Sequence, residues 1–137
     1  MTTVRLKQSD YEAITAHARN GLPNEACGLI AGKIDDDVKI VEKVYFLTNL
    51  DNSPEHFSLD PKEQLAAVKD MRANGLVPLG NFHSHPATPA RLSEEDIRLA
   101  YDSKASYLIL SLSEESPVLK AFGVVGGEVT PQAVEVL

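Results

Sequence analysis

The sequence is poor in cysteine and in basic residues. Its 137 residues include one cysteine, Cys27, which excludes an internal disulfide and a four-cysteine zinc cluster. A lone thiol suits a reducing compartment. Acidic residues outnumber basic ones by 20 to 13, giving a net charge of −7. An acidic chain argues against a surface that binds nucleic acid or anionic lipid, so we expect neither partner.

Long apolar runs are also missing. No stretch approaches the roughly 20 apolar residues that span a bilayer, and MTTVRLKQSDYEAI at the start has no signal-peptide core. We therefore expect a cytoplasmic protein. Hydrophobic residues still make up 43% of the chain, which can supply one hydrophobic core. The length favours a single domain covering residues 1–137.

Local patterns predict an α/β fold. Helical spacing and start signals predict helices at 9–20, with Ser9 as N-cap, at 61–73, with Asp60 as N-cap, and from Ser93 to about 103. Strand-like stretches lie at 26–34, 38–47, 76–85, 106–113, 117–125 and 129–137. Gly126 and Gly127 fit a hairpin turn between the last two strands. This irregular alternation predicts a mixed β-sheet sandwiched by helices.

The stretch NFHSHPATPARLSEEDIRL, residues 81–99, carries the clearest chemical signal. Residues two apart on a strand share a face, so His83 and His85 are a natural pair of zinc ligands. Asp96 could return as a third ligand and leave a fourth position for water, as in catalytic zinc sites. The structural alternative is a strand with two ordinary histidines, followed by a helix that Ser93 and Asp96 cap.

A catalytic zinc also needs a base, and two upstream residues are candidates for chemistry. Glu25, at the mouth of the apolar stretch ACGLIAG, could be a carboxylate whose pKa burial raises toward neutrality. The alternative for Glu25 is a solvated loop residue. Cys27 could pair with a histidine as a nucleophile, but its apolar neighbours favour a buried structural thiol.

These parts together resemble the JAMM metalloproteases, also called the MPN-plus family. Their pattern is an early glutamate, then H-[ST]-H-P, six residues and S-x-x-D. Here it is met by Glu25, HSHP at 83–86, ATPARL and SEED at 93–96. The resemblance implies an MPN/cytidine-deaminase-like domain with one zinc per chain, held by His83, His85 and Asp96. It also implies that Glu25 is the general base and that Ser93 hydrogen-bonds the oxyanion.

The resemblance further implies a substrate class. The family hydrolyses amide or isopeptide bonds, often after the Gly-Gly end of ubiquitin or a ubiquitin-like protein. The size of this chain is similar to that of small prokaryotic members, several of which act on ubiquitin-like sulfur-carrier proteins. The loop 49–60, with His56 and Phe57, is the segment long enough to grip such a substrate. The alternatives are a non-hydrolytic MPN-type binding module and, less favoured, a RadC-like relative.

Overall fold

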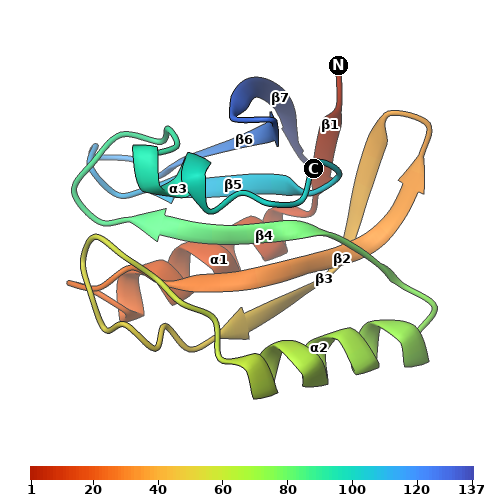
Figure 1. Ribbon diagram of the computed structural model, residues 1–137, viewed down its shortest axis with the longest axis horizontal. Helices are drawn as coiled ribbons and strands as arrows, with labels where there is room; N and C mark the ends of the chain where they lie inside the picture. Colours follow the sequence, from red (N-terminus) through yellow and green to blue (C-terminus); the bar gives the residue numbers. More distant parts are fainter.

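The computed structural model describes residues 1–137, in which a mixed seven-stranded sheet closes into a barrel (Figure 1). The strands are β1 (Thr3–Leu6), β2 (Cys27–Asp35), β3 (Val38–Leu47), β4 (Val77–His85), β5 (Ser106–Ser111), β6 (Val118–Val125) and β7 (Glu128–Val136). The helices are α1 (Gln8–Asn20), α2 (Pro61–Ala73) and α3 (Glu94–Arg98). The strand order is β1-β3-β2-β4-β5-β6-β7, with β1 also paired to β7.

The mixed sheet is confirmed, but the sequence did not predict its closure. The closing strand is β1, which runs parallel to both β3 and β7, so that Thr3 is level with Val38 on one side and Ala133 on the other. No strand was predicted there because four residues before a helix give too short a pattern to recognise. The sheet is therefore a barrel rather than a flat layer between helices.

Helices α1 and α2 still pack on opposite sides of β2. Ile30 belongs to a core that includes Ile14 and Ala18 of α1. Its neighbours on the strand, Leu29 and Ala31, belong to a second core with α2. This alternation is what a strand buried on both faces requires. Two cores thus hold β2 rigidly, and β2 leads directly out of the segment that carries Glu25.

The helix ends correct two predictions. Asp60 caps α2 as expected, because its side chain accepts a hydrogen bond from the Lys62 N–H at 2.9 Å. Ser9 is not the N-cap of α1, which begins at Gln8 after Lys7. Helix α3 ends at Arg98 rather than near 103.

A turn explains the short α3. The Asp102 N–H donates to the Tyr107 hydroxyl, and the Asp102 side chain accepts from the Lys104 N–H, so the chain turns into β5 instead of continuing the helix. Gly126 and Gly127 form the predicted hairpin turn between β6 and β7, with φ of 57° and 80°. No helix of the protein is long and apolar enough to cross a membrane.

Candidate metal centre

The end of β4 and the start of β2 bring distant residues together. The two strands run antiparallel with Cys27 opposite His83, so Glu25 lies near the level of His85. Ser84, between the histidines, stabilises this register through two hydrogen bonds to Ala26. Its Oγ accepts from the Ala26 N–H at 2.8 Å, and its N–H donates to the Ala26 carbonyl at 2.9 Å. The carboxylate and the histidine pair thus meet although 58 residues separate Glu25 from His83.

Three side chains converge as a ligand set. The Nε2 atoms of His83 and His85 are 3.2 Å apart, and each is 3.2 Å from Oδ2 of Asp96. Ligand atoms on a tetrahedral zinc with bonds of about 2.0–2.2 Å lie about 3.3–3.6 Å from one another. The triangle therefore fits a zinc ion, and the structure brings the three predicted ligands together.

The protonation of these groups also suits a metal. Nδ1 of His85 lies 3.0 Å from the Pro89 carbonyl, which can only accept, so Nδ1 carries the proton and the Nε2 lone pair faces the site. Burial lowers the pKa of His83 and keeps it neutral. Burial alone would raise the pKa of Asp96, but the adjacent imidazoles of His83 and His85 hold it well below its usual range, so the carboxylate is ionised.

Glu25 is buried beside this cluster. Its side chain is 6% exposed, and Oε1 is buried without a hydrogen-bond partner. Burial raises its pKa to about 7, an effect that His85 opposes and Asp96 reinforces. Its backbone is held by Ser53, whose carbonyl accepts from the Glu25 N–H at 2.8 Å. A solvated loop residue would show none of these features.

Ser93 caps α3, and this role is compatible with a hydrogen bond from its hydroxyl to an oxyanion. Its Oγ accepts from the Asp96 N–H at 3.0 Å, and its own N–H donates to Oδ2 of Asp96 at 2.9 Å, which makes a capping box. The cap uses the Ser93 hydroxyl as an acceptor only. The hydroxyl hydrogen therefore stays free to donate to a substrate.

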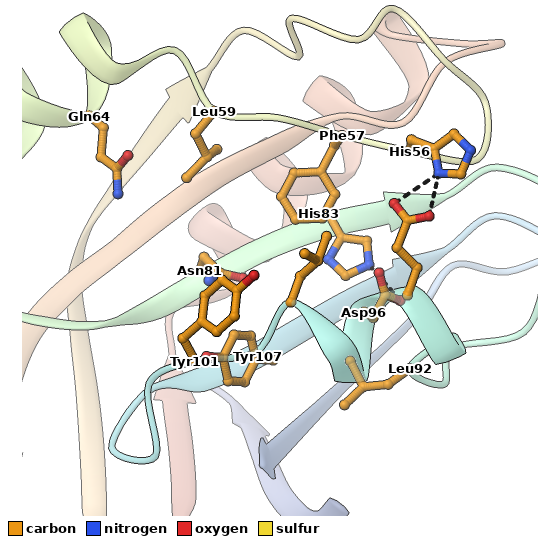
Figure 2. A pocket seen from close by; sticks show the side chains of 12 residues that line it. His56, Phe57, Leu59, Gln64, Asn81, His83, Leu92, Asp96, Tyr101 and Tyr107 are labelled. Carbon is orange, nitrogen blue, oxygen red and sulfur yellow. Dashed lines mark hydrogen bonds and ion pairs between the residues drawn. The ribbon is translucent and has the colours of Figure 1, made fainter. Parts of the chain in front are cut away.

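Two cavities flank the ligand triangle. An apolar cavity of about 330 Å³ is lined by His83 and Asp96 on the metal side (Figure 2). An open cavity of about 860 Å³ is lined by Glu25, His85 and Ser93. The cavities share His56 and Glu95, whose side chains form a bridge of 2.8 Å between Nδ1 and Oε2. This bridge ties the loop 49–60 to α3.

The loop residues predicted to touch substrate lie at these cavities. Phe57 stacks on the His83 ring with centroids 4.6 Å apart and an interplanar angle of 21°, and it lines the apolar cavity together with His56. Sequence reasoning missed Glu95, Asn81 and the Pro89 carbonyl at the site. Asn81 carried one usable signal, since it precedes His83 by two and so shares its face of β4.

Cys27 is structural. It is fully buried in the core under α2, and its Sγ lies 3.9 Å from the Leu47 carbonyl. Burial raises the pKa of the thiol to about 12, with nearby carboxylates adding to the effect. A thiol in this state is a poor nucleophile at neutral pH.

The family model described as prokaryotic homologues of the JAB domain matches residues 7–123. The chain belongs to this family. Among curated relatives, CysO-cysteine peptidase of Mycobacterium tuberculosis is 36% identical over 126 residues, which cover 91% of this chain and 85% of the relative. Desampylase of Pyrococcus furiosus is 34% identical over 103 residues, which cover 69% of this chain and 71% of the relative.

A solved structure shares the fold of this chain. The solution structure of a protein from Desulfitobacterium hafniense superposes with a TM-score of 0.91 at 57% identity, covering 98% of this chain and 92% of that one. The resemblance drawn from Glu25, the histidine pair, Ser93 and Asp96 is confirmed at the family level. The chain is a JAMM-type hydrolase, since its curated relatives are a peptidase and a desampylase.

Proposed function

We propose that this protein is a zinc-dependent peptidase that hydrolyses the amide bond at the C-terminal Gly-Gly of a ubiquitin-like sulfur-carrier protein. One observation carries the proposal. A 3.2 Å triangle of two imidazole nitrogens and a carboxylate oxygen lies beside the buried, unpaired carboxylate of Glu25. Ligand set, base and substrate cavities therefore occur at one place.

His83, His85 and Asp96 would hold the metal. When bound, zinc supplies a Lewis acid that activates water and polarises the scissile carbonyl. Glu25 accepts the proton of the attacking water, a role for which a pKa raised to about 7 by burial is suited. The same carboxyl then returns the proton to the departing amine. The free hydroxyl hydrogen of Ser93 donates to the oxyanion of the tetrahedral intermediate.

The two cavities suggest a direction for the substrate. Glu25 must reach the departing amine, and it lines the open cavity together with Ser93. We therefore assign the leaving group to the open cavity. The acyl side, which ends in Gly-Gly, takes the apolar cavity under Phe57. A narrow cavity with an aromatic roof favours residues without side chains over bulkier ones.

The relatives motivate the substrate class. The names CysO-cysteine peptidase and desampylase describe enzymes that cleave conjugates of small carrier proteins. We extend that class to this chain, with a sulfur carrier as the preferred partner because CysO-cysteine peptidase is 36% identical over 91% of this chain.

Metal analysis and a cleavage assay test the proposal. Purified protein should contain about one zinc per chain, as a site with three protein ligands implies, and should cleave a ubiquitin-like carrier extended past Gly-Gly. Glu25→Gln should keep zinc and lose turnover, while His85→Ala should lose both. Glu12→Gln, on the exposed side of α1, is the matched control and should change neither.

The outcomes separate the alternatives. A protein that binds the carrier with zinc in place but never cleaves it is the non-hydrolytic binding module. A metal-free protein that cleaves at the full rate contradicts the proposed chemistry altogether.

A further inference from the structure

Asn81 has hydrogen-bonding capacity that the protein itself does not use. It lies on β4 two residues before His83, so both side chains point to the same face. Its backbone is engaged on both sides, because β4 pairs with β2 and with β5 at this position. Its side-chain Oδ1 is buried and has no hydrogen-bond partner. Native proteins rarely leave such a group unpaired.

The surroundings of Asn81 indicate what could pair with it. Its carboxamide lines the apolar cavity beside the metal ligands (Figure 2). The apolar walls include Phe57 and Leu59 from the loop and Leu92, Leu99 and Tyr101 on the far side. The Tyr107 hydroxyl is already bonded to the Asp102 backbone. An extended peptide entering this cavity needs partners for its own N–H and C=O groups. The lining holds other polar side chains, Gln64 and His56 among them, but Asn81 is the one with a buried and unpaired oxygen.

We propose that Asn81 is a positioning residue, whose carboxamide hydrogen-bonds a peptide group of the acyl tail about two residues before the cleaved bond. This inference rests on the proposed function and adds a recognition element to it. Asn81 and His83 are two residues apart on a strand, which is about 6.6–6.8 Å. An extended tail running along β4 advances by the same distance in two residues, so a bond held near His83 places that peptide group at Asn81.

The cavity also continues past Asn81. A neighbouring hollow of about 450 Å³ shares Asn81, Tyr101 and Tyr107 with the apolar cavity and extends toward Val68 and Lys104. A tail therefore does not end at Asn81 but can run on between α2 and the segment before β5. Asn81 lies in the middle of this path, where a contact to the peptide backbone fixes the position of the tail relative to the metal.

The experiment measures binding without turnover. Zinc-loaded Glu25→Gln protein is titrated with a ubiquitin-like carrier whose Gly-Gly end is amide-linked to one cysteine. Adding Asn81→Leu, which keeps the shape of the side chain but not its hydrogen bonds, should weaken the affinity about 5- to 10-fold. The matched control, Asn20→Leu at the exposed end of α1, should leave the affinity unchanged. Zinc content and melting temperature verify that each variant is folded.

A backbone-modified substrate separates positioning from packing. Carriers in which an ester replaces the second or the third peptide N–H before the cleaved bond should bind about 5- to 10-fold more weakly at one of the two positions. With Asn81→Leu, that ester should cause no further loss. Equal losses with and without Asn81, or no loss at either position, overturn the inference. Asn81→Ser, too short to reach the tail, replaces Asn81→Leu if that variant loses zinc.

Failure of the proposed function can be distinguished from failure of the role proposed for Asn81. If wild-type protein does not cleave the conjugate, the proposed function fails and this inference fails with it. If wild-type protein cleaves and Asn81→Leu binds as well as its parent, only the role of Asn81 is rejected.

Discussion

Ser93 should perform two separable tasks, and three substitutions can distinguish them. Its oxygen caps α3 by accepting from the Asp96 N–H at 3.0 Å, and its hydroxyl hydrogen is available to an oxyanion. Ser93→Ala removes both functions. Ser93→Gly removes the hydroxyl but costs a helix start only a few tenths of a kcal/mol, against about 1 kcal/mol for alanine. Ser93→Thr keeps an acceptor and a donor.

The expected magnitudes differ enough to be measured. At about 2.1 cal/mol/K per residue, unfolding of this chain gives about 3–4 °C of melting temperature per kcal/mol. Ser93→Ala should therefore lower the melting temperature by about 3–4 °C, and Ser93→Gly by about 1 °C. Loss of one oxyanion donor should lower kcat by about 10²–10³ in both variants. Ser93→Thr should stay near wild type in both measurements.

Calorimetry and single-turnover cleavage of a carrier conjugate provide the two readings. Zinc content must be measured in each variant, since the Ser93 N–H also holds Oδ2 of the proposed ligand Asp96 at 2.9 Å. If kcat falls only in step with the melting temperature, Ser93→Gly will be nearly as active as wild type. That result would refute the oxyanion role and show that Ser93 acts only as a helix cap.

Three further predictions follow from the buried groups. At a free zinc concentration of about 100 times the dissociation constant, zinc binding contributes about 2.7 kcal/mol to the free energy of unfolding. Removing the zinc by chelation should therefore lower the melting temperature by about 9 °C. His85→Ala should show no such shift. In metal-free protein, the pKa of Glu25 is raised from 4.5 to about 7 by burial, so the folded state binds the proton more tightly and stability should fall as pH rises through that interval. Differential scanning calorimetry at pH 5 and pH 7.5 should show this fall in the metal-free wild type and a smaller one in Glu25→Gln. Cys27→Ala should keep zinc and turnover, and the folded protein should resist alkylation as judged by mass spectrometry, whereas rapid loss of activity on alkylation would contradict a structural thiol.

The cluster of His83, His85 and Asp96 could be predicted because its geometry is local. A period of two fixes His83 and His85 on one face of any strand, whatever the rest of the fold does. The cap at Ser93 fixes where the following helix starts, and thereby the position of Asp96. Glu25 is different, because its place beside His85 depends on the register between β2 and β4, which no local pattern contains. Its position before an apolar strand made Glu25 a candidate base but left a solvated loop residue as an equal alternative, and the resemblance to a family favoured the base.

The features that escaped prediction depend on several segments packing together. The barrel closes through β1, whose parallel partners β3 and β7 lie far along the chain. The bridge from His56 to Glu95 needs the loop 49–60 and α3 to approach each other. The unpaired amide of Asn81 is visible only once the cavity around it is known. Each requires a tertiary arrangement that residue spacing does not encode.

The loop 49–60 links the proposed substrate cavity to the proposed base, Glu25. Nδ2 of Asn49 donates both to the Glu25 carbonyl at 3.0 Å and to the His56 carbonyl at 2.9 Å, while its Oδ1 accepts from the Ser58 N–H at 3.1 Å. One side chain therefore fixes the segment that carries the base and the segment that roofs the apolar cavity. Because the loop is also tied to α3 through Glu95, a change in its length would displace the Phe57 roof and the Glu25 carboxylate together. Substrate choice and catalytic geometry should for this reason vary jointly, not independently, when this loop is altered.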